Sequence, residues 1–536
     1  MPPYPNTSSG MVAALAEAGG DQTRISIDGN TITVNPVVVN VIYVPGRGGY
    51  LEIPPGTYSL YSSLLPEDYV TIRGSGMGAT ILRVAPGQNF DVISATGKCG
   101  LTVSDLTILG PGPKSGTNRH GVRLDTCRDC YFERVEVVDP DGMGFVFIDC
   151  ERCTGSACIV RCSDARYNSG SGSDIGWGYW LDCCSDCTFI GCFAYQIGFA
   201  FSIVGNDSTI SGTNDHMGTR TPDVTTGNSI VNCRVHRFAG HAYNINYCPG
   251  NTVSACVART YQGPQADRAA FQSKASNGDD PRANKFVGCA AIDVGTGFQA
   301  QEGSRTQLGD FVVQRAVYDA VRINSSPYAQ INNVTADGYG RYGITVEGGS
   351  PGVAIDGLYA TASSASCIAV RISNSGSCSV DNVMCYDTHA KTLQISAESS
   401  YVNIGPMVRA TYGIDDQSLT TIYPIMMSRE VSASGGGSKA GIAYPVAAIF
   451  VGRVDVTTID AISGTVPTVS VYGAGGSPVY VAAAAPQVAA GSVASFPAST
   501  RVSSSTLPAG KHLEASCTGT ASSGRFLISV AACRAQ

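Results

Sequence analysis

Three aspartates recur at the ends of short apolar segments: Asp125 in GVRLD, Asp149 in GFVFID and Asp182 in GYWLD. If these segments are neighbouring strands, stacking places the carboxyl groups about 5 Å apart. Two carboxylates at that distance cannot both stay ionised at low cost, so one pKa rises or a cation binds between them. A protonated acid beside an ionised carboxylate can cleave a glycosidic bond, with retention at about 5 Å and inversion at roughly 9 Å. The three aspartates are therefore catalytic candidates.

Two simpler roles are open to the same aspartates. A carboxylate at a strand end commonly accepts hydrogen bonds from turn amides, and stacked carboxylates can bind a structural or substrate-bridging Ca²⁺. Both tryptophans of the chain, Trp177 and Trp180, stand in the segment that ends at Asp182. An outward indole is a platform for a sugar ring. We therefore expect both tryptophans, and Arg123 in the same outward row, to bind substrate.

A second group of charged residues follows along the chain. Lys274 ends AFQSK, Glu302 ends FQAQE, and Arg322 and Glu347 lie in AVRIN and GITVE. We expect Glu302 to be a further catalytic candidate, and Lys274, Arg322 and Glu347 to contact substrate. The alternative for this group is a solvated, charged wall with no part in the chemistry.

A repeated strand must position these side chains. Ten segments alternate apolar and polar residues and recur once per coil of roughly 22–25 residues, at 121–125, 144–149, 178–182, 200–204, 242–246, 270–274, 298–302, 320–324, 343–347 and 368–372. The residues expected to point inward are Val122, Val146, Tyr179, Phe201, Tyr243, Phe271, Phe298, Val321, Ile344 and Ile368. The expected outward row is Arg123, Phe147, Trp180, Ser202, Asn244, Gln272, Gln299, Arg322, Thr345 and Ala369. This pattern predicts an all-β chain built around a right-handed parallel β-helix.

The 20 cysteines follow the same repeat. The spacings Cys127–Cys130, Cys150–Cys153 and Cys184–Cys187 look like zinc knuckles, but they recur once per coil. One position just before a strand is expected to form a stacked row of Cys158, Cys192, Cys233, Cys256, Cys289, Arg315, Asn333, Gly357 and Asn382. We predict reduced, buried, stacked thiols with no metal site and no cofactor. Disulfides or bound metal are the alternative.

Composition narrows the classes of partner. Charged residues make up 14% of the chain, glycine contributes 63 residues, and the net charge is −7. The high glycine content is typical of short strands joined by tight turns. The negative net charge argues against a nucleic-acid partner. No apolar run is long enough for membrane insertion. The opening residues MPPYPNTSSGMVAAL lack the basic region and apolar stretch of a signal peptide, so we expect folding in a cytoplasm and release by lysis.

Three parts are expected along the chain. Residues 1–48 form an N-terminal cap or attachment segment with a hairpin at 25–34, and residues 49–428 form the β-helix. After the linker-like stretch 432–441, the all-β region 429–536 forms a sandwich or jelly roll for trimerisation or glycan binding. Insertions expected to mark the functional face lie at 110–120, 163–177, 205–228, 262–269 and 275–284.

Several segments resemble known families. IPPGTYSL (53–60) and VTIRGSGMGATIL (70–82) resemble the opening of pectate-lyase-like β-helix proteins. SKAS and NKF, near Lys274, resemble alginate-lyase-like β-helices, in which a lysine and an arginine on neighbouring coils remove a proton; FQAQEG stands where the arginine coil would come. LPAGKHLEASCTGTASSGRFLISVAA resembles C-terminal modules of phage tail proteins.

The arrangement of cap, β-helix and all-β C-terminal module resembles bacteriophage tailspikes. That resemblance implies a homotrimer in the virion tail, attached through other tail or baseplate proteins, that acts on a capsule or lipopolysaccharide at the host cell surface. Three functions stay open. They are a tailspike depolymerase, with hydrolysis favoured over elimination; a bacterial polysaccharide lyase or C5-epimerase; and a receptor-binding tail protein without enzymatic activity.

Overall fold

In the computed structural model, the described residues form strands from β1 (Glu17–Ala18) near the N-terminus to β46 (Arg525–Arg534) near the C-terminus. The described residues are 17–18, 21–22, 40–43, 49–88, 90–110, 119–163, 176–205, 225–261, 268–274, 283–302, 305–386, 389–405, 407–408, 414–418, 421, 425–432, 440–443, 449–458, 468–472, 478–482, 493–497, 506–507, 513–518 and 525–534, with side chains described only between 49 and 421. Within them, no helix is long and apolar enough to cross a membrane. The chain forms two compact units, residues 1–307 and residues 308–536. The expected divisions after residues 48 and 428 stay predictions.

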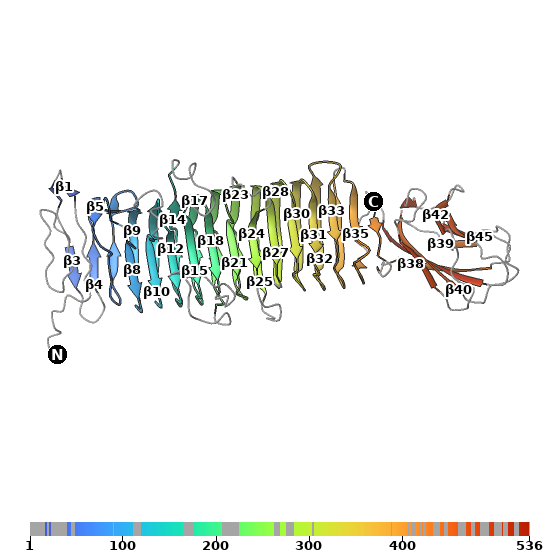
Figure 1. Cartoon of the computed structure of the whole chain (residues 1–536), viewed down its shortest axis with the longest axis horizontal. Coiled ribbons are helices and arrows are strands. Elements are labelled where there is room, and N and C mark those ends of the chain that lie inside the picture. The colour runs from blue at the N-terminus through green and yellow to red at the C-terminus, as the bar shows by residue number, and fades with distance from the viewer. Residues whose placement is uncertain are drawn as a thin grey trace. The chain divides into compact units, whose positions relative to one another are not determined.

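In the first unit, one strand of each coil joins a parallel sheet, called sheet 1 below (Figure 1). Its strands, each paired with the next, are β8 (Ile93–Thr96), β10 (Val122–Asp125), β12 (Met143–Ile148), β15 (Trp177–Asp182), β18 (Phe199–Val204), β21 (Tyr243–Asn246), β24 (Ala269–Lys274) and β27 (Thr296–Gln301). The predicted strands of this unit are confirmed. Their β-branched and aromatic residues suit a pleated, half-buried surface.

The other strands of these coils form the opposite walls. They are β4 (Gly49–Glu52), β5 (Gly56–Leu60), β6 (Thr71–Arg73), β7 (Thr80–Val84), β9 (Thr102–Leu109), β11 (Tyr131–Val138), β13 (Thr154–Ser156), β14 (Ile159–Arg161), β16 (Thr188–Ile190), β17 (Phe193–Ile197), β19 (Ser229–Val231), β20 (Arg234–Phe238), β22 (Thr252–Ser254), β23 (Val257–Tyr261), β25 (Asn284–Val287) and β26 (Ala290–Val294). Near the N-terminus, β1 (Glu17–Ala18) pairs with β2 (Asp21–Gln22), and β3 (Asn40–Tyr43) with β4, both antiparallel. The hairpin predicted at 25–34 lies outside the described residues.

The strands that the second unit contributes to the parallel sheet are called sheet 2 below. It consists of β29 (Val321–Asn324), β31 (Tyr342–Glu347), β33 (Ile368–Ile372), β35 (Lys391–Ile395) and β37 (Ile414–Asp416). The facing wall consists of β28 (Thr306–Ala316), which begins just before this unit, and of β30 (Gln330–Tyr339), β32 (Ala354–Ala362), β34 (Ser379–Cys385) and β36 (Asn403–Ile404).

Antiparallel strands follow in the same unit. One sheet runs in the order β38 (Ile425–Ser432), β46 (Arg525–Arg534), β40 (Ile449–Thr458) and β43 (Val493–Pro497), with β44 (Thr506–Leu507) also paired to β40. The other runs in the order β39 (Ala440–Ala443), β45 (Leu513–Thr518), β41 (Thr468–Tyr472) and β42 (Pro478–Ala482). The predicted fold class, a right-handed parallel β-helix with a C-terminal all-β module, is confirmed.

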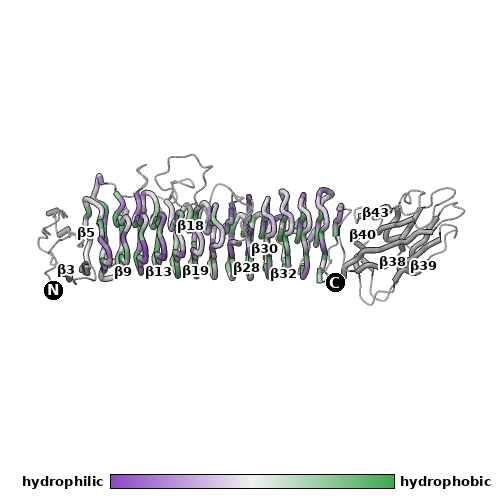
Figure 2. Tube along the Cα trace, turned by 90° about the horizontal axis from the view of Figure 1, so that it is seen from below, coloured by the Kyte–Doolittle hydropathy of each residue, from purple (hydrophilic) through white to green (hydrophobic). Residues whose placement is uncertain are grey.

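Stacked aromatic rings fill the interior behind sheet 1. Tyr179 lies 4.4 Å from Phe201 and 5.3 Å from Phe145, and the Tyr243 ring lies 4.6 Å from Phe271 and 5.3 Å from Phe201. Each ring sits directly against its equivalent in the next coil because parallel strands repeat at about 4.8 Å. Apolar and polar residues are mixed along the coils of each unit (Figure 2). In β10, for example, Val122 and Leu124 are buried while Arg123 and Asp125 are half-buried, as expected for a strand that buries one face.

The described cysteines all have free thiols, and all but Cys99 are buried. The row from Cys158 to Cys289 is confirmed: the Cys192 amide donates to Cys233 Sγ at 3.3 Å, and the Cys233 amide to Cys256 Sγ at 3.4 Å. Burial raises the pKa of the Cys158 thiol. A protonated thiol in an apolar site is a packing group rather than a nucleophile.

The predicted continuation of that row is wrong at Arg315. The Asn333 side chain donates to Asp310, not to Arg315, at 3.2 Å. Asn333, Gly357 and Asn382 have φ of +53°, +93° and +53°. They occupy a left-handed turn position rather than the buried thiol position, which explains why Asn and Gly recur there.

Candidate functional site

The outer face of sheet 1 carries two columns of side chains, a column being a set of residues paired across successive strands. The first is Arg123, Val146, Trp180, Ser202, Asn244, Gln272 and Gln299, and the second is Asp125, Ile148, Asp182, Val204, Asn246, Lys274 and Gln301. Indole, hydroxyl and amide groups at one-coil spacing are groups that contact sugar rings and hydroxyls.

Two predicted residues of the outward row, Phe147 and Ala369, are wrong, and so is the predicted inward position of Val146. Val146, not Phe147, pairs with Arg123, and Phe147 pairs with Leu124 on the inner face. Inside, Phe147 packs 5.8 Å from Phe132 and 5.4 Å from Phe189. Burial of the Phe147 ring determines which face of β12 points inward, because a slip of one residue would exchange all inward and outward side chains of the strand.

The same slip removes Asp149 from the predicted stack. Asp125 pairs with Ile148, which pairs with Asp182, so these two aspartates share a column with an isoleucine between them. Asp149 follows the end of β12 with φ +51°, and its amide donates to the carbonyl of Asp182 at 2.9 Å. The prediction of three aspartates at one strand position is therefore wrong, and Asp149 occupies a turn.

Asp125 is partly buried, which disfavours the charged form of its carboxyl group. Burial raises the pKa of its carboxyl group, the Arg123 guanidinium opposes that shift, and the charge of Asp149 adds to it. Arg123 Nη2 lies 3.6 Å from Asp125 Oδ2, and the Asp125 side chain keeps 30% of its surface exposed. Asp182, two strands away in the same column, is only 2% exposed.

The two tryptophans lie together, and their role as a sugar platform stays a prediction. The rings of Trp177 and Trp180 stack at 4.8 Å, and Trp177 meets Phe199 edge-on at 5.3 Å. Both rings pack on the buried side chains of Met143, Val146 and Ile148. Trp180 Nε1 is buried and has no hydrogen-bond partner in the described part of the chain.

Amide groups continue the outer face beyond the tryptophans. Asn244 is 5% exposed and Gln272 is 6% exposed although both face away from the core. Within the described residues, Asn244 Oδ1 and Asn246 Oδ1 are buried and accept no hydrogen bond. Buried carbonyl oxygens without donors are costly, and two on one face match a ligand that presents hydroxyl groups.

Lys274 and Glu302 come together as an ion pair. Lys274 Nζ lies 3.0 Å from Glu302 Oε2 and 5.3 Å from the centre of the Tyr247 ring. Burial lowers the pKa of Lys274, but hydrogen bonds to Tyr247 and Glu302 outweigh it, so the net shift is upward. Lys274 is therefore held in its charged form. Glu302 sits in a turn with φ +58°, its side chain 53% exposed.

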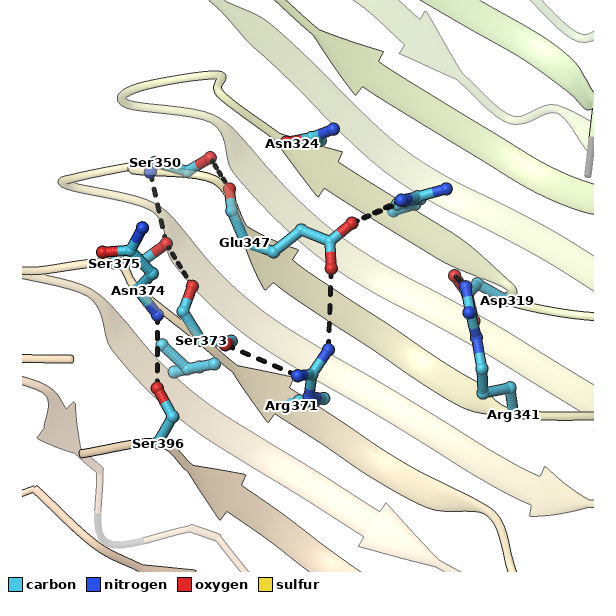
Figure 3. Close-up of polar contacts among 12 residues, drawn as sticks. Asp319, Asn324, Arg341, Glu347, Ser350, Arg371, Ser373, Asn374, Ser375 and Ser396 are labelled. Carbon is cyan, nitrogen blue, oxygen red and sulfur yellow. Dashed lines mark hydrogen bonds and ion pairs between the residues drawn. The ribbon is translucent and has the colours of Figure 1, made fainter. Parts of the chain in front are cut away.

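In the second unit, the predicted substrate contacts Arg322 and Glu347 form an ion pair, and a third residue joins them. Arg322 Nε donates to Glu347 Oε1 at 2.7 Å, and Arg371 Nη1 lies 3.5 Å from Glu347 Oε2 (Figure 3). Arg371, rather than the predicted Ala369, pairs with Thr345 in the outward column. The prediction that Ile368 pairs with Ile344 is wrong by two residues, since Ile368 pairs with Tyr342.

Arg371 could have been found from the sequence. Both the predicted and the observed pairings place odd-numbered residues of β33 outward, so the segment IAVRI already exposes an arginine. Only the alignment of the strand to its neighbour was shifted. A rule that outward columns prefer charged over small residues would have selected Arg371.

No group of three or more metal-ligating side chains occurs among the described residues. The predicted insertions at 110–120, 163–177, 205–228, 262–269 and 275–284 lie largely outside the described residues. The absence of a cofactor, with a structural or substrate-bridging Ca²⁺ as the alternative, stays a prediction.

No protein-family model and no curated protein sequence matches the chain. Solved structures do show similarity. The catalytic unit of a thermostable GH87 α-1,3-glucanase from Streptomyces thermodiastaticus matches with TM-score 0.44 and 12% identity over 70% of this chain and 64% of that one. A GH87 α-1,3-glucanase catalytic domain in complex with nigerose matches with TM-score 0.44 and 13% identity over 66% of this chain and 63% of that one.

A tailspike protein of E. coli bacteriophage HK620 matches with TM-score 0.43 and 11% identity over 90% of this chain and 87% of the tailspike. The chain spans less than two thirds of the length of the glucanase structures. At these identities and TM-scores, the matches carry no conclusion about activity.

Proposed function

We propose that this chain is a phage tailspike that binds a bacterial surface polysaccharide across the outer face of sheet 1 and hydrolyses it. The observation that carries the proposal is the column shared by Asp125 and Asp182 beside the indole of Trp180. A carboxyl group of raised pKa, a second carboxyl group and a stacked indole therefore lie on one face, which supports the proposal.

In this mechanism Asp125 donates a proton to the glycosidic oxygen. The raised pKa keeps its carboxyl protonated at pH values where an ordinary aspartate is ionised. Asp182 acts as the base that activates water on the opposite side of the sugar ring. The Trp180 ring and the amides of Asn244 and Gln272 hold the neighbouring sugars.

Hydrolysis fits the structure better than elimination by a lyase or epimerase. Elimination needs a deprotonated base beside the sugar ring, and Lys274 is the candidate for that base. Its upward-shifted pKa and its ion pair with Glu302 keep the amine protonated. In this proposal Glu302 is the counter-ion of Lys274 rather than a catalytic acid.

The assignment to a phage tail is part of the proposal. It includes a homotrimer, attachment through other tail or baseplate proteins, a place in the virion and action at the host cell surface. Buried free thiols such as Cys158 and Cys192 support folding in a reducing host cytoplasm. Light scattering after gel filtration tests the trimer: three chains per particle are expected, and a monomer would contradict it.

The activity is tested by incubating the protein with capsular polysaccharides and lipopolysaccharides from a panel of bacteria. Hydrolysis gives new reducing ends without the ultraviolet absorbance of an unsaturated sugar. Reducing ends with that absorbance would overturn hydrolysis in favour of elimination. Binding without shortening of any polymer would leave a receptor-binding protein, and no binding at all would overturn the proposal.

A further inference from the structure

Three arginines gather on the outer face of sheet 2. Arg322 lies on β29, Arg371 on β33, and Arg341 directly before β31. Arg322 and Arg371 share the carboxylate of Glu347, and Arg341 pairs with Asp319 (Figure 3). Three guanidinium groups thus face two carboxylates, which leaves one positive charge in excess.

Arg341 is committed to the fold. Its Nε lies 2.9 Å from Asp319 Oδ1 and its Nη2 lies 2.6 Å from Asp319 Oδ2, and Asp319 is fully buried. The guanidinium also lies 5.0 Å from the centre of the Tyr342 ring. A bidentate pair with a buried carboxylate fixes Arg341 in place and leaves it little freedom to serve a ligand.

Arg371 is held more loosely than its neighbours. Its contacts with Glu347 and with Ser373 Oγ are long, at 3.5 and 3.4 Å, whereas Arg322 Nη2 reaches Glu347 Oε1 at 2.6 Å. Its side chain is 28% exposed and lies 5.2 Å from the centre of the Tyr342 ring. A guanidinium offers five N–H donors, so Arg371 has donors left for an anion.

A buried hydroxyl group lies between the two arginines of the column. Thr345 pairs with Arg322 on one side and with Arg371 on the other. It is fully buried, and Thr345 Oγ1 has no hydrogen-bond partner within the described part of the chain. A buried hydroxyl group without a partner is costly in a finished core, and the register places Thr345 in the outward column between Arg322 and Arg371.

We propose that Arg371, Thr345 and Arg322 form a subsite for a carboxylate-bearing sugar, so that the polysaccharide is an acidic one containing uronate units. This inference rests on the proposed function, because it names the class of the polymer. The planar fork of Arg371 binds the uronate carboxylate, and Thr345 Oγ1 bonds one of its oxygens or a neighbouring hydroxyl. Glu347 holds Arg322 and Arg371 at a fixed separation and accepts from a sugar hydroxyl.

The test uses the polymers that the full-length protein binds in the panel above. Each is compared with a sample whose uronate carboxyl groups have been chemically reduced to alcohols, which keeps the chain and removes the charge. We expect reduction to weaken binding by about tenfold or more. Arg371→Gln should bind the native polymer about tenfold more weakly, bind the reduced polymer as the parent does, and so lose the preference.

Two control variants separate this subsite from general electrostatics. Arg234→Gln removes one charge from an exposed arginine on β20 and should keep the parent's preference. Arg371→Lys keeps the charge without the fork and should restore the preference only in part.

Equal binding of native and reduced polymers by the parent protein would overturn the inference and leave the proposed function intact. If Arg371→Gln kept the parent's preference for native over reduced polymer, the inference would likewise be overturned and the proposed function left intact. A parent protein that binds no polymer would overturn both. The melting temperature is measured for every variant. A variant whose melting temperature equals that of the parent protein is folded, so its change in affinity reports on binding alone.

Discussion

Asp125 and Asp182 face the same side of sheet 1 in one column, with the buried Ile148 between them. Two strand spacings separate their backbones by roughly 9–10 Å. Carboxyl groups about 6.5–9.5 Å apart leave room for a water molecule and give inversion, whereas about 5 Å gives retention. We therefore predict that the first sugar released has the opposite anomeric configuration to the bond cleaved. Proton NMR of the fresh digest measures this, and a retained anomer would contradict the Asp125–Asp182 pair.

Asp125→Asn should lower the rate of hydrolysis by about 10²- to 10⁴-fold, the usual contribution of a general acid. Asp129→Asn, a change at an exposed turn aspartate that pairs with Arg152, is the matched control and should leave the rate unchanged. Because burial disfavours the ionised form of Asp125, the amide should not destabilise the fold at neutral pH. A rate within threefold of the parent's, roughly 0.6 kcal/mol, would remove Asp125 from the mechanism.

The pH profile follows from the same carboxyl group. The pKa of Asp125 is raised above the ordinary value of about 3.9. The acid form that donates the proton is fully present below the folded-state pKa and is lost as pH rises through it. The alkaline limb of kcat/KM should therefore lie above the ordinary aspartate range, and a limb within that range would contradict the assignment.

Trp180→Ala should weaken binding of the polysaccharide by about tenfold, or ~1.4 kcal/mol, through loss of the ring platform. Trp180→Phe keeps a ring and should recover part of the affinity. Tyr386→Ala, at a 60% exposed aromatic residue elsewhere, should have no effect. Affinity electrophoresis compares the three variants, and parental binding by Trp180→Ala would place the sugar elsewhere.

Three buried asparagines, Asn228, Asn251 and Asn284, form a ladder in which each backbone amide donates to the side chain of the next. This ladder supports the coils that position the site. Asn251 Oδ1 accepts from the Asn228 amide at 3.0 Å, and Asn251 Nδ2 donates to the Thr225 carbonyl at 3.2 Å, with Asn251 fully buried. Asn251→Leu should cost about 3 kcal/mol because the freed groups have no other partner. Asn332→Leu, at an exposed position on β30, should cost less than about 0.5 kcal/mol. Equal urea midpoints for the two variants would show that the asparagine ladder contributes little to the free energy of unfolding.

The sequence by itself determined the β-helix, its strand positions and the stacked thiols. Alternation of apolar and polar residues repeats once per coil, and a repeat of that kind is a local pattern that needs no knowledge of partners. It also placed Trp180 beside Ser202 and Arg322 beside Thr345 in the outward row, because these strands align without a slip.

The tertiary structure alone decided the register. Phe147 points inward and packs on Phe132 and Phe189. In this register Asp149 lies in a turn, and only Asp125 and Asp182 share a column. A two-residue shift on β33 likewise brought Arg371 to Glu347. Register depends on which side chains fill the interior of the neighbouring coil, and that packing energy is set between coils rather than within a segment.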